Sequence, residues 1–367
     1  MERFAFVVHP LGDPRRDTAR RFPFARFLPV KAVELFLRTL KPFVMSHITG
    51  VRSLTGEEAE GWFIACPLSA RQMLKLPLDF VYRRLIKCGR MAEEMGAEII
   101  GLGAFSSIVG DAGITVKNNL DIAVTTGNSY TVASSVEALI RAAETLGYDP
   151  RNCSAAVVGA TGSIGKACSL ILRDKVGKLI LVGKTKDKVT SLLAEVQAEG
   201  QALVEATTEV ASIKEADLII SATSAISTVI EPEQLKIGAV LCDVAQPRDV
   251  SRRVTEARDD VLVFDGGVIE VPGDVDFGLN FGFPPRMAYA CTAETMILAL
   301  DGRYESFTLG REIQPARVAE IGKLAAKHGF RVVGFRSFNR ALSPEDVDEI
   351  RKTAARRKAA ALKELSR

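Results

Sequence analysis

Six short apolar segments, rich in β-branched residues, alternate with helical patterns in the middle third of the chain. They lie at 154–160, 178–183, 202–207, 216–223, 239–245 and 261–267. Strands that are apolar nearly throughout are buried on both faces, as in a parallel sheet covered by helices. This part of the sequence therefore predicts an α/β fold with a doubly wound parallel sheet of the Rossmann type.

A glycine-rich turn, "VVGATGSIGKACSLIL", follows the first of these strands and leads into a helix. Gly159, Gly162 and Gly165 permit a tight turn, close approach of a pyrophosphate and close helix–strand packing. Free N–H groups at the helix start favour an anion. Glycines that serve packing alone are the alternative, but the complete strand–turn–helix context favours nucleotide binding. The predicted cofactor contacts here are Gly159, Ala160, Thr161, Gly162, Ser163, Ile164, Gly165, Ala222 and Thr223.

The end of the second strand indicates which dinucleotide binds. An Asp or Glu at this point binds the ribose 2′-OH of NAD. The sequence instead has "LVGKTKDK", with Lys184, Thr185 and Lys186 before the first acid. Because cations and a hydroxyl suit a 2′-phosphate, we expect NADPH; a solvated loop is the other interpretation.

Length and composition exclude several classes of protein. A chain of 367 residues is long enough for two domains, and a net charge of +3 does not argue for nucleic acid. No CxxC pair occurs and only three histidines are present, so we expect neither a disulfide framework nor a metal site. We also find no signal peptide and no apolar run of membrane-spanning length. These features predict a protein of the reducing cytoplasm.

The remaining patterns suggest a second α/β domain before the nucleotide-binding one and helices after it. Strand patterns alternate with helical ones in the first part of the chain, and an amphipathic helix at 126–147 bridges to the second part. The expected domains are 1–147, a substrate- or acyl-binding α/β domain; 148–288, the Rossmann domain; and 289–367, a C-terminal helical segment.

Cys291 is the candidate nucleophile. It lies near a predicted helix start, shortly after the sixth strand and after Arg286. Thiolates attack acyl groups well, and a helix N-terminus or a cation lowers the thiol pKa. A buried core cysteine is the alternative, since free cysteine is often buried. Cys66 is a second candidate, whereas Cys153, Cys168 and Cys242 fit the core.

Several motifs occur in the order found in a known family. They are "GLGAFSSI" (101–108), "TTGNSYT" (125–131), "VVGATGSIG" (157–165), "DGGVIE" (265–270), "MAYACTAETMILAL" (287–300) and "KHGF" (327–330). On these motifs the sequence resembles the long-chain fatty acyl-[acyl-carrier-protein] reductases, best known from cyanobacteria. The first 60 residues match poorly, and the charged segment after "KHGF" extends beyond the cyanobacterial members.

The resemblance implies an NADPH-dependent reduction of an acyl thioester to a fatty aldehyde through an acyl-cysteine at Cys291. Acyl carrier protein or acyl-CoA is the implied donor. Candidate oxyanion or substrate contacts are Ser106, Ser107, Thr126 and Asn128, for which capping of helices and turns is the alternative role. His328 is a weaker candidate for a general acid. Phe277, Phe281 and Phe283 are candidates for the lining of an acyl tunnel, or else core residues.

Acyl carrier proteins are acidic, so a basic surface is expected to dock them. One basic cluster contains Arg15, Arg16, Arg20, Arg21 and Arg26, and another contains Arg351, Lys352, Arg356, Arg357 and Lys358. Solvated charge is the alternative for both. The C-terminal cluster also suits peripheral contact with an anionic membrane. An aldehyde-consuming enzyme is a further expected partner.

Two other functions stay open. The first is an NADP-dependent oxidoreductase of the shikimate dehydrogenase type, which needs a lysine–aspartate pair and no cysteine. Lys117 and Asp121 are available for it. The second is a nucleotide-sensing or scaffolding protein without turnover, which would bind NADPH and form no aldehyde.

Overall fold

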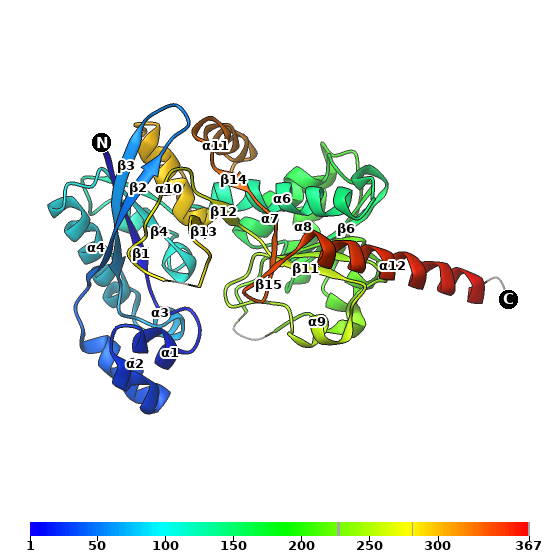
Figure 1. The fold of residues 1–367 in the computed structure, drawn as a ribbon, viewed down its shortest axis with the longest axis horizontal. Helices are drawn as coiled ribbons and strands as arrows, with labels where there is room; N and C mark the ends of the chain where they lie inside the picture. Colours follow the sequence, from blue (N-terminus) through cyan, green and yellow to red (C-terminus); the bar gives the residue numbers. More distant parts are fainter. Residues whose placement is uncertain (226–227, 281, 366–367) are drawn as a thin grey trace. The chain divides into compact units, whose positions relative to one another are not determined.

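A computed structural model describes residues 1–225, 228–280 and 282–365, which form two compact units. The first unit contains Met1–Tyr130 and Ile269–Arg331, and the second contains Thr131–Val268 and the chain from Val332 onward (Figure 1). The expected boundaries at 147/148 and 288/289 fall elsewhere. The chain leaves the first unit within helix α6 (Asn128–Thr145), and α10 (Ala290–Leu300) returns to the first unit because it packs on that unit's sheet.

The first unit has a five-stranded sheet in the order β2-β3-β1-β4-β5. Its strands are β1 (Glu2–Val8), β2 (Phe43–Arg52), β3 (Glu58–Ala65), β4 (Ile99–Leu102) and β5 (Ala123–Thr125). β1 pairs in parallel with β3 and β4, β4 pairs in parallel with β5, and the edge strand β2 is antiparallel to β3. The expected second α/β domain is therefore present.

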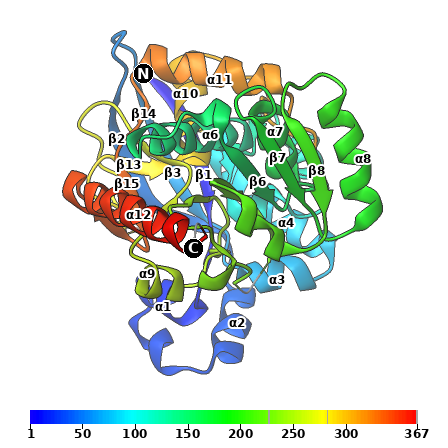
Figure 2. The same cartoon turned by 90° about the vertical axis from the view of Figure 1, so that its right-hand side faces the viewer.

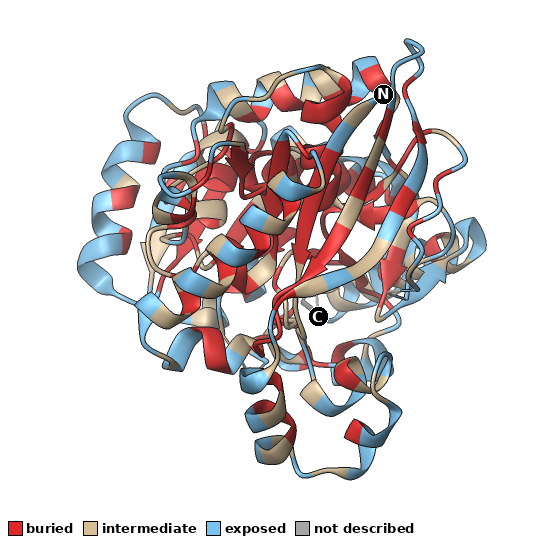
Figure 3. Cartoon of the chain, turned by 90° about the vertical axis from the view of Figure 1, so that its left-hand side faces the viewer, coloured by how far each residue is buried: buried red, intermediate tan, exposed pale blue. Residues whose placement is uncertain are grey.

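Helices cover both faces of this sheet. Successive side chains of β1 point to opposite faces and so contact different helices. Ala5 and Val7 join a core with Leu85 and Cys88 of α4 (Leu78–Glu94). On the other face, α10 packs on β1 and β4, and Gly101 makes room for it. A Cβ at Gly101 would lie 2.1 Å from the Thr295 hydroxyl oxygen. Figure 3 shows the burial of the chain: β4 and β5 are buried throughout and β1 along its centre, whereas the edge strand β2 is mostly exposed or half-buried.

The other helical elements of the first unit are short, apart from α11. They are α1 (Pro14–Ala19), η1 (Pro23–Phe27), α2 (Val30–Thr39), α3 (Ala70–Lys75), η2 (Ala104–Ser107), α5 (Ile114–Lys117) and α11 (Pro315–His328). The pattern from 69 to 96, which fits one or two helices, forms two, α3 and α4, because Pro77 leaves Leu76 extended.

The second unit contains the predicted doubly wound sheet. Its six parallel strands run in the order β11-β10-β9-β6-β7-β8. They are β6 (Ser154–Val158), β7 (Lys178–Val182), β8 (Leu203–Thr207), β9 (Leu218–Ser221), β10 (Val240–Asp243) and β11 (Leu262–Asp265). Each lies within one of the six apolar segments, so the Rossmann-type fold class is confirmed. Figure 2 shows β6, β7 and β8 side by side.

Helices and a C-terminal extension complete the second unit. The helical elements are η3 (Pro150–Asn152), α7 (Ser163–Leu172), α8 (Lys186–Gln197), η4 (Val210–Glu215), η5 (Pro232–Gln234), α9 (Arg253–Ala257) and α12 (Pro344–Leu365). A hairpin of β15 (Phe335–Ser337) and β16 (Arg340–Leu342) packs on β11 through the Phe264 and Phe335 rings, 5.0 Å apart. The remaining strands are β12 (Val268–Glu270), β13 (Met287–Tyr289) and β14 (Arg331–Val332).

No described helix combines the length and the apolar character needed to cross a bilayer.

We predict that Leu85→Ala lowers the free energy of unfolding of the first unit by about 2–5 kcal/mol, because it opens a cavity in the core under α4. Urea unfolding followed by the fluorescence of Trp62, the single tryptophan, reports on this unit. Leu78→Ala on the same helix is the matched control, since Leu78 is exposed. Equal losses for both variants would contradict this packing.

Candidate functional site

Cys291 is the second residue of α10, and Tyr289 at the N-cap makes no side-chain capping hydrogen bond. All six cysteines are described and free; five are buried, whereas Cys291 is half-buried. Cys66, the other candidate nucleophile, is fully buried in the core under α4. Of the two, Cys291 alone is open to a reagent from solvent.

The turn that follows β5 lies against Cys291. Gly127 has a φ of +72°, and a Cβ there would lie 2.3 Å from the Cys291 Cα and 2.5 Å from its Cβ. Thr126 and Asn128, two of the predicted substrate contacts, flank this glycine and are buried. Among the described residues the Thr126 hydroxyl has no hydrogen-bond partner. A developing oxyanion needs a donor of this kind, and Thr126 precedes the glycine that lies against Cys291.

Glu294, one turn after Cys291, connects α10 to this loop. Its fully buried carboxylate accepts hydrogen bonds from the Thr125 hydroxyl at 2.5 Å, the Tyr130 backbone N–H at 2.8 Å and the Thr308 hydroxyl at 2.8 Å. Sequence reasoning missed this residue. The available signal was a lone acid inside the otherwise uncharged helix "ACTAETMILAL".

Burial changes the pKa of both Cys291 and Glu294, which lie one turn apart on α10. Burial raises the pKa of the Cys291 thiol; hydrogen bonds from Thr292 oppose this rise, the Glu294 carboxylate adds to it, and the resulting pKa is about 11. Burial also raises the pKa of Glu294 above its ordinary value, although its hydrogen bonds oppose the rise. The resting thiol is therefore protonated at neutral pH and must lose its proton as it attacks.

The side chains of Ser106 and Ser107 form hydrogen bonds within their own turn. The Ser106 hydroxyl accepts from the Gly103 N–H at 3.0 Å and lies 2.8 Å from the Gly103 carbonyl, to which it donates. The Ser107 hydroxyl donates to the Ala104 carbonyl at 2.7 Å. Both side chains are buried. This geometry matches the capping alternative for these two residues.

His328 also has structural partners. Its buried ring lies between Ser53 Oγ, 2.9 Å from Nδ1, and Asp301 Oδ1, 3.0 Å from Nε2. Burial favours a neutral Asp301, but hydrogen bonds from Lys327 and His328 prevail and lower its pKa below the ordinary value. The imidazole therefore connects the end of α11 to neighbouring segments.

The phenylalanines before Cys291 differ in their surroundings. Phe277 is buried, with its ring 6.2 Å from that of Phe63. Phe283 meets the Tyr289 ring edge-on at 4.7 Å. Phe281 lies outside the described residues.

In the second unit, the glycine-rich turn joins β6 to α7. Gly159 has a φ of +81°, and a Cβ there would lie 2.7 Å from the Ala222 carbonyl oxygen. A Cβ at Gly165 would lie 2.2 Å from the Gly159 carbonyl oxygen. Gly162 caps α7 without a side chain. The backbone is thus left open above the helix N-terminus, which fits the pyrophosphate of a dinucleotide.

The neighbouring strand ends complete this edge of the sheet. Lys184, Thr185 and Lys186 are exposed where β7 ends and α8 begins. Thr223, after β9, is held by the buried Asp249, which accepts from its N–H at 2.9 Å and from its hydroxyl at 2.5 Å. Nearby, burial and the adjacent Asp249 raise the pKa of Asp243 to about 8.

The residues of the shikimate-type alternative do not form a pair. Lys117 Nζ donates to the carbonyls of Leu120 and Ile122, each at 3.3 Å. Asp121 is 94% exposed and forms an ion pair with Arg90 at 3.3 Å. Within the described residues, no His, Cys, Asp and Glu side chains gather in a group of three or more that could hold a metal.

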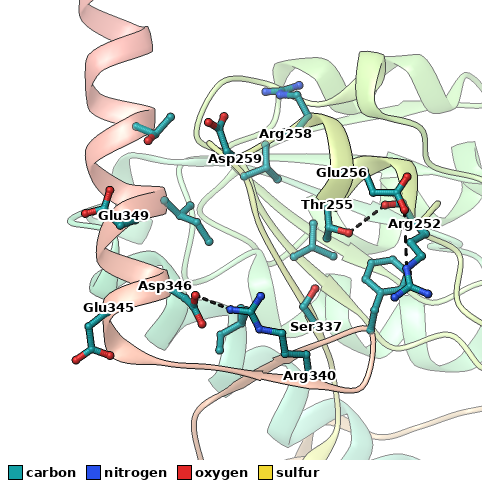
Figure 4. Close-up of a pocket in the computed structure, with 16 residues that line it drawn as sticks. Arg252, Thr255, Glu256, Arg258, Asp259, Ser337, Arg340, Glu345, Asp346 and Glu349 are labelled. Carbon is teal, nitrogen blue, oxygen red and sulfur yellow. Dashed lines mark hydrogen bonds and ion pairs between the residues drawn. The ribbon is translucent and has the colours of Figure 1, made fainter.

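A pocket of about 680 Å³ lies in the second unit between α12, α9 and the β15–β16 hairpin (Figure 4). Arg252 and Arg340 line it together with acidic side chains of α12, and Arg340 pairs with Asp346 at 2.6 Å. Its walls thus carry both signs of charge. The predicted cofactor and acyl-site residues lie elsewhere.

The chain is similar to several known proteins. The family model for shikimate/quinate 5-dehydrogenase matches residues 141–265. Aminotransferase PigE of a Serratia species is 34% identical over 95% of this chain, which spans 42% of that protein. Long-chain acyl-[acyl-carrier-protein] reductase of Synechococcus elongatus is 30% identical over 89% of this chain and 98% of its own length. A glutamyl-tRNA reductase of Sorangium cellulosum is 27% identical over 45% of this chain and 31% of its own length.

We predict that alkylation of Cys291 by iodoacetamide is slow at neutral pH and accelerates up to a pH of about 11, the raised pKa of this thiol. Glu294→Gln removes a nearby negative charge, so the rise should move to lower pH. Mass spectrometry of the modified peptide measures the rate.

Glu57→Gln serves as the control for this variant, because Glu57 is an exposed acid of the same unit that pairs elsewhere. A profile with an ordinary thiol pKa in the wild type, or the same shift in both variants, would contradict the role given to burial and to Glu294.

Proposed function

Since the chain belongs to the family of the long-chain acyl-[acyl-carrier-protein] reductases, we propose that it reduces a long-chain acyl thioester to the fatty aldehyde, with NADPH as reductant. Membership makes it a nicotinamide-dependent oxidoreductase. The observation that carries the finer proposal is the half-buried Cys291 against the Gly127 turn, in a chain that also has an open glycine-rich turn.

The first step is acyl transfer to Cys291. The sulfur attacks the thioester carbonyl, and the Cys291 proton passes to the departing phosphopantetheine thiol as its C–S bond breaks. The oxyanion that develops is stabilised by the Thr126 hydroxyl and the Asn128 amide, both beside Gly127. The product of this step is an acyl-cysteine, so ping-pong kinetics are expected.

The second step reduces that acyl group. When bound by the second unit, NADPH would supply the hydride. The thiohemiacetal on Cys291 would then collapse, its C–S bond would break, and the aldehyde would leave while the sulfur takes up a proton from solvent. Water must be kept from the acyl-cysteine in the meantime, because hydrolysis would yield the acid instead.

The choice of NADPH rests on the end of β7. Lys184 and Lys186 are exposed cations that flank the Thr185 hydroxyl. Together they provide the donors and the charge that a 2′-phosphate needs, and no acid stands where a ribose hydroxyl of NAD would be bound.

Acyl carrier protein and acyl-CoA are both candidates for the acyl donor, since each presents the same phosphopantetheine thioester. An enzyme that consumes aldehydes is the proposed downstream partner. The Serratia relative is consistent with this, because its name is that of an aminotransferase and this chain spans 42% of its length.

The shikimate-type alternative receives less support. The matching family model covers residues 141–265, which include the nucleotide-binding strands but not Cys291 or its turn. It therefore bears on cofactor binding and leaves the substrate chemistry open.

We predict that intact-protein mass spectrometry finds an acyl adduct after mixing with a long-chain acyl-carrier thioester without NADPH. The adduct should be absent in Cys291→Ala, and NADPH should discharge it as aldehyde. Cys66→Ala is the matched control and should keep the adduct, because Cys66 is buried. An adduct that persists in Cys291→Ala, or none in the wild type, would sink the covalent mechanism.

We also predict that Lys184→Gln and Lys186→Gln each raise the KM for NADPH about tenfold, as expected for loss of one charge-assisted contact to phosphate. The KM for NADH should stay the same. Lys188→Gln is the control, since Lys188 is exposed on the same helix two residues further on. Parallel changes for both cofactors would argue against a 2′-phosphate site.

A further inference from the structure

Residues 13–41, which contain α1, η1 and α2, form a small N-terminal lobe at one end of the first unit (Figures 1 and 3). Ala25, Val33 and Leu37 make a separate small core inside it. The proposed reaction assigns no role to this lobe.

The lobe carries a cluster of aromatic rings that are open to solvent. The Phe22 ring lies 6.1 Å from Phe24, 5.3 Å from Phe36 and 6.5 Å from Phe43 in the adjoining strand β2, and none of the four is buried. Phe24 is 48% exposed, and Phe27 nearby is 76% exposed. Large apolar side chains that remain exposed on one lobe are candidates for a binding surface.

The charge of the lobe is strongly positive. Its basic residues are Arg15, Arg16, Arg20, Arg21, Arg26, Lys31, Arg38 and Lys41, and its acids are Asp13, Asp17 and Glu34. All three acids already have partners. Asp13 forms an ion pair with Arg15, and Asp17 accepts hydrogen bonds from the Leu11 and Gly12 N–H groups. Glu34 accepts a hydrogen bond from Ser69 and forms an ion pair with Arg71. The lobe therefore carries an excess of positive charge.

Cations and rings occur together on this surface. The Arg26 guanidinium lies over the Phe27 ring at 4.5 Å, and that of Arg21 lies 5.9 Å from the Phe22 ring centre. Basic side chains beside exposed phenylalanines are the composition of segments that lie in the interface of an anionic bilayer.

We propose that the N-terminal lobe binds the surface of an anionic phospholipid bilayer. The arginines contact the head groups, and Phe24 and Phe27 enter the boundary between head groups and acyl chains. An acidic carrier protein would also satisfy the arginines, but its polar surface would leave the exposed rings without an apolar partner. An anionic bilayer provides partners for both the arginines and the exposed rings.

The lobe is also hydrogen-bonded to the segment that leads to Cys291. Arg20 Nη1 donates to the Asn280 carbonyl at 3.3 Å, in the segment that leads to α10 and Cys291. Binding of the lobe would therefore hold that segment near the membrane, into which a hydrophobic product partitions. The proposal itself concerns the surface alone and stands without the proposed reaction.

The test is sedimentation of the full chain with vesicles of phosphatidylcholine and phosphatidylglycerol in equal parts, and with vesicles of phosphatidylcholine alone. The triple variant Arg16→Gln, Arg21→Gln, Arg26→Gln should bind the anionic vesicles about a hundredfold more weakly, at about fivefold per basic residue. Phe27→Ser should weaken binding about tenfold and leave its salt dependence unchanged.

The matched control removes the same charge from α12 through Arg351→Gln, Arg356→Gln and Lys363→Gln, three exposed residues. It should bind like the wild type. Wild-type melting temperatures and NADPH binding in every variant confirm the fold. No vesicle binding by the wild type, or equal loss in both triple variants, overturns the proposal. If the lobe variants bound acyl carrier protein more weakly but bound the vesicles as the wild type does, that result would also overturn the proposal and assign the surface to the carrier.

Discussion

The Glu294 carboxylate is fully buried in a helix with no other charge, and a group of this kind is stable there only if its oxygens accept hydrogen bonds. The donors come from the end of β5, the start of α6 and the loop at Thr308. Without these donors the buried oxygens would be unsatisfied, which costs about 1–3 kcal/mol for each such group. The carboxylate thus fixes three separate segments around α10. One of them is the turn whose Gly127 lies against Cys291, so the surroundings of the thiol depend on an acid one helical turn away.

Parallel strands explain why the functional loops gather where they do. The turn beside Cys291 follows β5, the glycine-rich turn follows β6, Lys184 follows β7 and Thr223 follows β9. The carboxyl ends of parallel strands lie at one edge of a sheet, and ligands of open α/β sheets bind there. Each unit obeys this rule by itself. Among the described residues, the first unit presents the Cys291 thiol and the unpaired Thr126 hydroxyl, and the second presents the glycine-rich turn and exposed lysines. The proposed acyl chemistry and the proposed cofactor binding would therefore fall on two different sheets.

Local pattern was enough to predict the second sheet, because each strand is apolar along its whole length and each connection carries its own turn residues. Thr126, Asn128 and Cys291 were found through short motifs. Glu294 was missed because its partners Thr125 and Tyr130 are 169 and 164 residues away, and one sequence shows no sign of such pairing. The domain boundaries failed for the same reason: α10 follows the second sheet in sequence but packs on β1 and β4. For Ser106 and Ser107 the sequence left substrate contact and capping as alternatives, and in the structure their hydroxyls bind carbonyls three residues earlier.

A raised thiol pKa looks unsuited to a nucleophile, yet it fits the proposed acyl transfer. The phosphopantetheine thiol that departs needs a proton, and the Cys291 thiol holds one at neutral pH because burial keeps its pKa at about 11. Attack and departure can then share a single proton, with no separate acid required. His328, the histidine first considered for that task, is committed to Ser53 and Asp301 instead. Burial is the main cause of the raised pKa, and the nearby Glu294 carboxylate adds to it, since a negative charge disfavours a thiolate. In the proposed reaction, this low thiolate content would protect the thiol from alkylation and oxidation until an acyl group binds.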